Sequence, residues 1–378
     1  MIPTLSIAPP RGGLPAAAPA GARVVVAMSG GVDSSTAAAL LVEAGYDVVG
    51  VTLKLTDASG TAASIGGRCC SPRDIDDARA TAAALGFPHY VLDHTAAFRD
   101  AVIDDFVAEH RAGRTPNPCV RCNEKLKFGP LVRFARAVGA ARLATGHYAR
   151  LESGPDGPRL CRALDRDKDQ SYFLFGVTPA VLAHVTFPLG AMTKEQVRAL
   201  ARRYALSNAD KPDSQQICFI PDGDHKAFVE ARGGAGPAGH IVDESGATLA
   251  PHTGTHRFTI GQRRGVPGAG GGDRRFVLRI DPSSGRVVVG PREALARSLM
   301  QVDDLRWTAG QAPRAWPLRC AVQIRHHAAP TPAWVDAPES PEASVSVRLD
   351  EPTVGVAPGQ AAVFYDGDQV VGGGWIRA

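Results

Sequence analysis

Residues 24–42 read VVVAMSGGVDSSTAAALLV, and this stretch decides the expected fold. Residues 24–28 form a short β-branched run, which is typical of a buried strand. Residues 36–42 are rich in Ala and Leu and lead to Gly45, which is typical of a helix with a glycine C-cap. The order of strand, glycine loop and helix predicts an α/β unit with a ligand-binding loop.

The loop over residues 29–35 has the composition of a phosphate cradle. Several backbone N–H groups of such a loop converge at a helix N-terminus, where the macrodipole also attracts an anion. The hydroxyls of Ser29, Ser34 and Ser35 can donate further hydrogen bonds. The loop has neither the Walker lysine nor the third glycine of a dinucleotide fold, and a plain glycine turn does not account for the full SGGVDSS string. The string resembles the pyrophosphate loop of the ATP-pyrophosphatase superfamily, whose members cleave ATP between the α and β phosphates and adenylate a substrate oxygen.

The composition describes an ordinary globular chain of 378 residues, long enough for two or three domains. No run of 18 apolar residues occurs, so we expect no membrane association. Seven cysteines without a secretory signal indicate a reducing compartment, and we expect a cytoplasmic protein. The net charge of +4 does not by itself indicate whether the protein binds a charged partner such as a nucleic acid. Residues 1–22 are rich in Ala, Pro and Gly and are expected to be a disordered leader.

Strands alternate with helices after the loop. We expect strands over residues 46–55, 89–94 and 142–149, and helices over 71–86, 95–111 and 131–138. This alternation predicts a doubly wound parallel sheet whose ligand lies at the carboxyl ends of the strands. The glycine loop, the turn after Leu55 and residues 146–148 should therefore surround one crevice.

The C-terminal third has the alternating texture of β structure. Residues 276–290 read as strand, turn and strand, and residues 361–376 as a hairpin around Asp366 and Gly367. We therefore expect a catalytic domain over residues 23–222, a small central β-rich domain over 223–298 and a C-terminal β-barrel over 299–378.

Two cysteines lie in the stretch RTPNPCVRCNEKLKF, at Cys119 and Cys122. Its prolines predict an extended loop and no helix. Such a C-x-x-C pair could be half of a zinc site, a redox pair or two ligands of an iron–sulfur cluster. A zinc site is disfavoured because no second C-x-x-C or H-x-x-x-H supplies the other ligands. A further cysteine, Cys218, lies in a segment expected to lead into a strand.

Six strings occur in the order SGGVDSS, TPNPCVRCNEKLKF, ATGHYAR, DKDQSYFL, KPDSQQICFI and HTGTHRFTIGQRRG. Their combination resembles the tRNA-specific 2-thiouridylases, and the similarity runs from Arg23 to the C-terminus. The family replaces the C2 oxygen of uridine 34, the wobble base, with sulfur in tRNAs for Lys, Glu and Gln. The residues agree with that chemistry, because adenylation turns the oxygen into a leaving group and a cysteine persulfide can deliver sulfur.

The resemblance implies roles for individual residues. Cys122 takes the position of the nucleophile and Cys218 that of the persulfide carrier, and sulfur transfer would leave the two joined as a disulfide. ATP, with Mg²⁺, would be bound by Ala27, Met28, Ser29, Gly30, Gly31, Val32, Asp33, Ser34, Leu53 and Gly146. The tRNA would be contacted by Asn117, Pro118, Cys119, His147, Lys168, Asp169, Gln170, Arg325, His326 and Gln360, and by the C-terminal barrel. A cysteine desulfurase or a sulfur relay protein would be the upstream persulfide donor.

Cys119 departs from the pattern of many relatives, which have an aspartate there as a candidate acid/base group near the uridine. A free thiol titrates near ~8.5 and cannot replace a carboxylate in the same protonation state. Cys119, Cys122 and Cys218 could instead hold a [4Fe–4S] cluster that binds sulfide. We favour the persulfide relay and keep the cluster as an alternative.

Two functions of other kinds remain as alternatives: a pyrophosphatase-type amidating synthetase and a tRNA-binding protein without catalysis. Nothing in the sequence indicates a glutaminase partner, and a pure binder has no use for two thiols on separate motifs. Cys161 and Cys320 lie in apolar stretches and are expected to be core residues, and Cys69 and Cys70 have no assigned role.

Overall fold

The structure is a computed structural model that describes residues 21–56, 72–155, 157–213, 216–220, 223–233, 236–268, 274–340 and 343–377. Most of the expected leader, the part of the turn after Leu55 that follows Thr56, and Cys69 and Cys70 lie outside the described residues. The chain forms two compact units, Met1–Phe98 with Glu124–Phe219, and Arg99–Asn123 with Ile220–Ala378. Among the described residues, no helix has both the length and the apolar character needed to cross a membrane.

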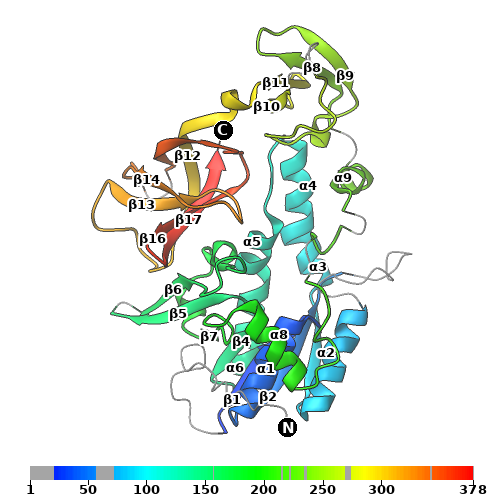
Figure 1. Ribbon diagram of the computed structural model, residues 1–378, viewed down its shortest axis with the longest axis vertical. Helices are drawn as coiled ribbons and strands as arrows, with labels where there is room; N and C mark the ends of the chain where they lie inside the picture. The colour runs from blue at the N-terminus through cyan, green and yellow to red at the C-terminus, as the bar shows by residue number, and fades with distance from the viewer. Residues whose placement is uncertain are drawn as a thin grey trace. The chain divides into compact units, whose positions relative to one another are not determined.

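The first unit is built on a parallel sheet (Figure 1). Its described strands are β1 (Arg23–Ala27), β2 (Asp47–Lys54), β3 (His89–Asp93), β4 (Arg142–Thr145) and β7 (Val185–Thr186), in the order β3-β2-β1-β4-β7. Val24, Val25 and Val26 of the central strand are fully buried, as a strand covered on both faces requires. The predicted doubly wound parallel sheet is confirmed.

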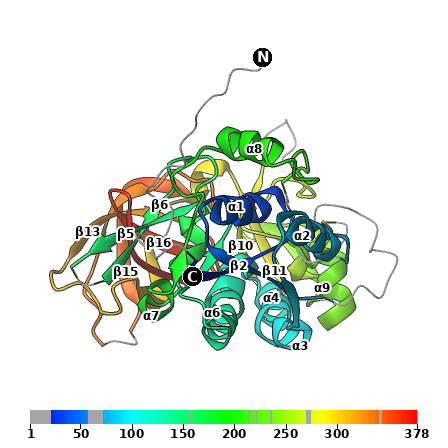
Figure 2. The same cartoon turned by 90° about the horizontal axis from the view of Figure 1, so that it is seen from below.

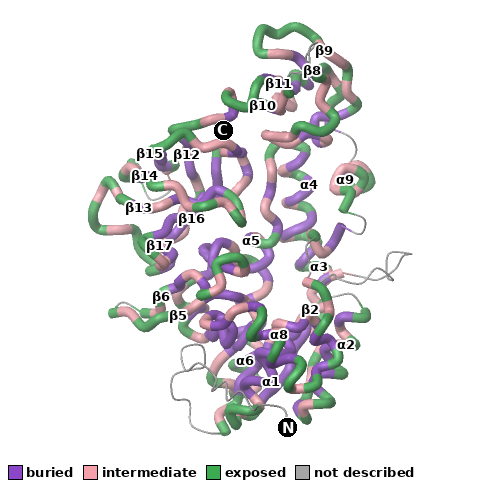
Figure 3. Tube along the Cα trace, viewed as in Figure 1, coloured by how far each residue is buried: buried purple, intermediate pink, exposed green. Residues whose placement is uncertain are grey.

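Helices cover both faces of this sheet. Figure 2 shows α1 (Val32–Glu43) and α2 (Pro72–Leu85) on one side and α6 (Phe128–Ala137) on the other. Most residues of α1 are buried, as the purple colour of this helix in Figure 3 shows. α1 starts four residues earlier than expected, because Gly31 in an extended conformation serves as its N-cap and Asp33 suits its first turn. Ser34 and Ser35 are therefore helical residues.

Shorter elements complete the first unit. They are α3 (Thr95–Phe98), a π-helical turn at Asn123–Lys127, the antiparallel hairpin of β5 (Ala149–Gly154) and β6 (Gly157–Arg162), a 3₁₀ turn at Ser171–Leu174, α7 (Pro179–Leu182) and α8 (Lys194–Arg203). The strand expected over 142–149 is split, because residues 146–148 bend between β4 and β5. α8 packs on α1 through a cluster that includes Ala37, Leu40 and Val197.

The second unit opens with a helical segment and a small sheet. The described helices are a π-helical turn at Arg99–Ile103, α4 (Asp104–Arg111), α5 (Pro118–Cys122) and α9 (His225–Gly233), with 3₁₀ turns at Thr255–Arg257 and Arg292–Leu295. The described strands of the sheet are β10 (Phe276–Asp281), β11 (Arg286–Gly290), β8 (Gly239–Asp243) and β9 (Thr248–His252), in that order. β11 and β8 are parallel, and the other pairs are antiparallel.

A closed antiparallel barrel ends the chain. Six described strands form it, in the order β12 (Ala296–Trp307), β15 (Val345–Val354), β14 (Thr331–Val335), β13 (Leu318–Gln323), β16 (Ala361–Asp366) and β17 (Gln369–Arg377). β12 also pairs with β17, which closes the barrel. Its core contains Val302, Val322 and Phe364, together with Cys320. The barrel and the hairpin at Asp366 confirm the all-β prediction.

Two local predictions are wrong. Residues 118–122 form the helix α5, because Pro118 occupies the first helical position, where its missing N–H costs nothing. Cys218 lies in a turn, and the element that follows it is the helix α9, where we expected a strand.

Candidate active site

The glycine loop leads into α1 without a side-chain cap. Gly31 makes no side-chain cap hydrogen bond, so the first backbone N–H groups of α1 are not capped by a side chain. The backbone N–H of Ser29 donates to Ser34 Oγ (3.1 Å), and Ser34 Oγ donates to the carbonyl of Gly31 (3.1 Å). The serines thus fix the loop, and the first N–H groups of α1 lack a side-chain cap, an arrangement that suits a phosphate.

Two glycines let the backbone pass close to its neighbours. Gly30 has φ of +72°, and a Cβ there would lie 2.1 Å from the carbonyl oxygen of Asp74. A Cβ on Gly146 would lie 2.7 Å from the backbone nitrogen of Ser34. The structure therefore brings Gly146 beside the loop, as the position of the strand ends predicted. Met28, Val32 and Leu53 are buried apolar side chains of the same unit, and Ala27 ends β1.

Asp33 is held by Tyr148, which was expected at the same crevice but without a role, and by Lys194, which the sequence did not indicate. Lys194 Nζ lies 2.7 Å and 2.8 Å from the two carboxylate oxygens of Asp33, and the Tyr148 hydroxyl donates to Asp33 Oδ1 (2.9 Å). Burial, followed by the charge of Asp33, raises the pKa of Tyr148 far above its usual range, so the phenol stays protonated. Asp33 is thus oriented by one ammonium and one neutral donor.

Lys194 also links the loop to the segment that leads to Cys218. Its ammonium lies 2.7 Å from Asp213 Oδ1, and Asp213 also pairs with Lys168 (2.8 Å) and Arg198 (3.1 Å). Burial alone would raise the pKa of Asp213, but hydrogen bonds from Lys168 and Lys194 outweigh it and lower that pKa. Lys168, a predicted tRNA contact, is therefore one partner of a half-buried charge network.

The chain after α8 also supports Gly30. The carbonyl of Gly30 accepts from Asn208 Nδ2 (3.1 Å) and from Lys211 Nζ (3.1 Å). Lys211 forms ion pairs of 2.6 Å with Asp74 and Asp77 at the start of α2. In the sequence, the KPDS letters of the KPDSQQICFI string, at residues 211–214, could have indicated that Lys211 contacts the glycine loop.

Asp169 and Gln170 make contacts inside the first unit. The carboxylate of Asp169 is buried, accepts from the backbone of Ala163 (2.9 Å) and pairs with Arg162 (2.9 Å). Gln170 Oε1 accepts from the backbone N–H of Tyr148 (3.0 Å). Gln170 therefore holds the bend that carries Tyr148 to Asp33, whereas Asp169 fixes the end of β6.

His147 lies among aromatic rings in the first unit. Its ring centroid is 5.7 Å from that of Phe128 and 6.2 Å from that of Phe187, and its Nδ1 is 2.9 Å from Thr145 Oγ1. Desolvation, with a smaller effect of Lys127, lowers the pKa of His147 to about 3. The imidazole is therefore neutral at physiological pH.

We expect His147 to make the protein less stable in mild acid. Between pH 6.5 and 3 the unfolded state binds a proton that the folded state does not, so the free energy of unfolding falls as pH decreases, by up to about 1.4 kcal/mol per pH unit. About one pH unit above 6.5 the imidazole is almost entirely neutral in both states, and the effect vanishes. Urea unfolding of wild type and His147→Gln at pH 7.5 and 5.5 measures how far the free energy of unfolding of each protein falls between the two pH values. The pH dependence should be smaller in the variant, and an identical dependence would contradict the assignment.

The C-x-x-C pair lies on α5 in the second unit. Asn117 is the N-cap of α5 and accepts from the backbone N–H of Val120 (3.4 Å). Cys119 is exposed and Cys122 is buried, one turn apart on the helix. Cys218 belongs to the first unit and is partly exposed. The described residues hold no group of three or more His, Cys, Asp or Glu side chains placed to bind a metal ion.

The remaining predicted tRNA contacts lie in the barrel. Gln360 Nε2 donates to the carbonyl of Thr115 (2.9 Å), so it supports the segment that leads to Asn117. Arg325 donates to the carbonyl of Val354 (3.5 Å), and the His326 ring packs on that of His327 at 3.9 Å between centroids.

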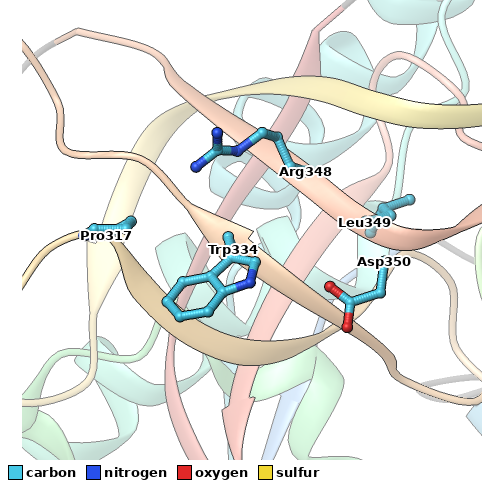
Figure 4. A pocket seen from close by; sticks show the side chains of 5 residues that line it. All are labelled: Pro317, Trp334, Arg348, Leu349 and Asp350. Atoms are coloured by element: carbon cyan, nitrogen blue, oxygen red, sulfur yellow. The ribbon is translucent and has the colours of Figure 1, made fainter.

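A shallow hollow of about 440 Å³ lies on the barrel, lined by Pro317, Trp334, Arg348, Leu349 and Asp350 (Figure 4). The Arg319 guanidinium lies 5.1 Å from the Trp334 ring centroid and forms a bidentate ion pair with Asp350. The hollow is lined by none of the predicted site residues.

Three family models match the chain. The tRNA methyl transferase HUP domain matches residues 22–222, the tRNA methyl transferase PRC-barrel domain matches 226–291, and the aminomethyltransferase beta-barrel domain matches 297–376. The first alone covers more than half of the chain.

Full-length relatives narrow the family further. The tRNA-specific 2-thiouridylase MnmA of Rhodospirillum rubrum is 50% identical over 368 residues, which are 95% of this chain and 97% of that protein. The protein of the same name from Geobacter metallireducens is 49% identical over 361 residues, 94% of this chain and 97% of that protein. Among solved structures, a 4-thiouridine synthetase–RNA complex with bound ATP covers 56% of this chain and 49% of that chain, at 16% identity and a TM-score of 0.32. Identity near one half over almost all of both chains, together with the matched domains, means that this protein belongs to the tRNA-specific 2-thiouridylase family.

Proposed function

We propose that this protein replaces the C2 oxygen of uridine 34 with sulfur in tRNAs for Lys, Glu and Gln, and that it uses ATP to do so. The observation that carries the proposal is the start of α1, where an uncapped helix N-terminus and the Gly30–Gly31 turn form a phosphate cradle without a Walker lysine. That cradle suits an enzyme that releases pyrophosphate. The family membership and the cysteines at 122 and 218 support the sulfur chemistry.

The first step is adenylation of the base. The C2 oxygen attacks the α-phosphorus of ATP, the bond to the β-phosphate breaks, and pyrophosphate leaves. The first N–H groups of α1 would bind the phosphates and stabilise the charge that develops on them. Mg²⁺ is usually held by one or two carboxylates and the substrate phosphates, and Asp33 is the carboxylate within the loop. When bound, the ion would neutralise phosphate charge.

The second step moves sulfur. The terminal sulfur of a Cys218 persulfide attacks C2, and AMP leaves with the former C2 oxygen. The Cys122 thiolate then attacks the Cys218 sulfur, which breaks the S–S bond to the base and leaves the thiocarbonyl on uridine. The two cysteines end as a disulfide, which a cellular reductant must open before the next turnover.

The partners follow from this chemistry. A cysteine desulfurase or a sulfur relay protein would load Cys218 in the cytoplasm. The wobble base would leave the anticodon stack, and the free energy of unstacking is modest for a base in a single-stranded loop. Asn117, Pro118 and Cys119 on and before α5 would face that base. Lys168, His147, Arg325, His326 and the barrel would contact the tRNA, with Asp169, Gln170 and Gln360 supporting those segments.

Nucleoside mass spectrometry tests the product. The protein is incubated anaerobically with ATP, Mg²⁺, a reductant, a persulfide donor and unmodified tRNA for Lys. We expect 2-thiouridine from this tRNA and none from the same tRNA carrying cytidine 34. Sulfur at another position, or none with active donor present, would reject the proposed function.

A further inference from the structure

Arg121 lies between the two cysteines of α5, and its side chain is only 18% exposed. Its guanidinium carbon lies 3.8 Å from the ring centroid of Trp375 on β17. Its Nη1 lies 3.4 Å from Asp304 Oδ2 of β12, and its Nε lies 3.9 Å from Asp105 Oδ2 of α4. Two of these three contacts are to the barrel, and all belong to the second unit. We propose that Arg121 is a positioning residue that fixes the cysteine helix α5 on the C-terminal barrel and so sets which thiol is presented.

The barrel is locally distorted where it meets Arg121. Asp304 has φ of +49°, a conformation that residues with a Cβ seldom adopt. It lies at the break in register between β12 and β17, which falls between Asp303 and Arg306. Bulges of this kind redirect a side chain out of the regular strand. Here the carboxylate meets Arg121 and also Arg306, at 2.7 Å.

The chain before α5 is tied to the same barrel. The backbone N–H of Thr115 donates to the carbonyl of Pro358 (2.7 Å), and the Thr115 carbonyl accepts from Gln360. Gly359, at φ of +87°, lies where a Cβ would be 3.0 Å from the Thr115 nitrogen. The barrel therefore contacts both the entry to α5 and the residue between its cysteines.

A helix of five residues is not stable alone, so these contacts determine how it lies. Cys122 is buried and Cys119 is exposed, and a rotation of α5 about its axis would change both exposures. The planar guanidinium can stack on an indole and pair with carboxylates at once, which a lysine ammonium cannot do in the same way. The barrel is thus a part of the thiol site in addition to its proposed role toward tRNA. The consequence for sulfur transfer rests on the function proposed above, whereas the anchoring of α5 does not.

Thiol alkylation tests the anchoring without ATP or tRNA. Iodoacetamide labelling rates of individual cysteines are followed by peptide mass spectrometry in wild type, Arg121→Gln, Arg121→Lys and Trp375→Leu. We expect the labelling rate of Cys122 to rise at least tenfold in Arg121→Gln and Trp375→Leu, and less in Arg121→Lys. The double variant should add little to either single variant, because both remove the same contact.

Arg319→Gln is the matched control, because Arg319 also lies over a tryptophan and pairs with an aspartate on the same barrel. Its labelling pattern should equal that of wild type. The buried Cys320 reports on folding, because it becomes reactive only when the barrel opens. An unchanged Cys122 rate in Arg121→Gln, with Cys320 still protected, would overturn the proposal.

Single-turnover assays with sulfur-loaded protein connect the anchor to the reaction. We expect Arg121→Gln to slow 2-thiouridine formation at least tenfold while pyrophosphate release stays within twofold of wild type. Equal rates of 2-thiouridine formation in the variant and wild type would overturn the positioning role. If wild type forms no 2-thiouridine and Arg121→Gln still exposes Cys122, the anchoring holds and only the proposed function fails.

Discussion

Gly30→Ala is expected to lower ATP-dependent pyrophosphate release by at least about 100-fold, because small displacements of catalytic groups have effects of that size. The new Cβ would lie 2.1 Å from the carbonyl oxygen of Asp74, a backbone atom that cannot rotate away. The loop or the start of α2 must shift, and either shift disturbs the amides that face the phosphates. The rate of pyrophosphate release and the Kd for ATP both measure the effect.

Gly45→Ala separates this clash from ordinary backbone strain. Gly45 also has a positive φ, +81°, but a Cβ there meets nothing within 4 Å. Both variants carry the cost of a left-handed alanine, about 1 kcal/mol of the free energy of unfolding, but only Gly30→Ala changes the loop. Gly45→Ala should keep wild-type ATP use. Equal activity in the two variants would show that the glycine loop does not bind the nucleotide.

Cys122→Ser and Cys218→Ser are expected to separate the two halves of the reaction. Each should reduce 2-thiouridine formation by at least about 1000-fold, as the loss of a nucleophile does, while pyrophosphate release persists. Cys320→Ala is the control, because burial raises the pKa of Cys320 to about 12 and leaves almost no thiolate at neutral pH. Thiolation that survives in the double serine variant would disprove the role of both thiols.

Cys119→Ser distinguishes the persulfide relay from the cluster alternative. The relay uses Cys122 and Cys218, so this variant should keep at least a tenth of wild-type thiolation. A cluster held by three cysteines would lose a ligand, and both iron content and activity would fall together. Loss of thiolation together with loss of bound iron would therefore contradict the relay.

Local patterns were enough to predict the sheet and the loop. The Val24–Val26 run, Gly30 and the Ala-rich helix are close in sequence, and their structure follows from burial and backbone conformation. The barrel could be predicted for the same reason, because alternating residues and glycine turns are local signals. The helix that contains Cys119 was not predicted, because the prolines were interpreted as helix breakers, whereas Pro118 occupies the first position of the helix, where proline is tolerated.

Long-range partners could not be predicted from one sequence. Lys194 reaches Asp33 across 161 positions and Tyr148 reaches it across 115. No local pattern links Lys194 to Asp33, since their proximity results from the packing of α8 on α1. Tyr148 follows β4, which pairs with β1, so the strand ends bring it near the loop, but its hydrogen bond to Asp33 could not be read from the sequence. The contacts that group Arg99–Asn123 with the second unit are also long-range, so no local pattern indicates them. The contacts of Gln360 and Arg121 likewise depend on that tertiary arrangement.

The most direct measurement is pyrophosphate release from ATP by anaerobically purified protein with unmodified tRNA. Two otherwise identical tRNAs for Lys are compared, one with uridine 34 and one with cytidine 34. Adenylation of the wobble base predicts release with the first tRNA and only background with the second, even when sulfur is withheld. Equal release with both tRNAs, or no release although ATP and tRNA are both bound, would contradict it.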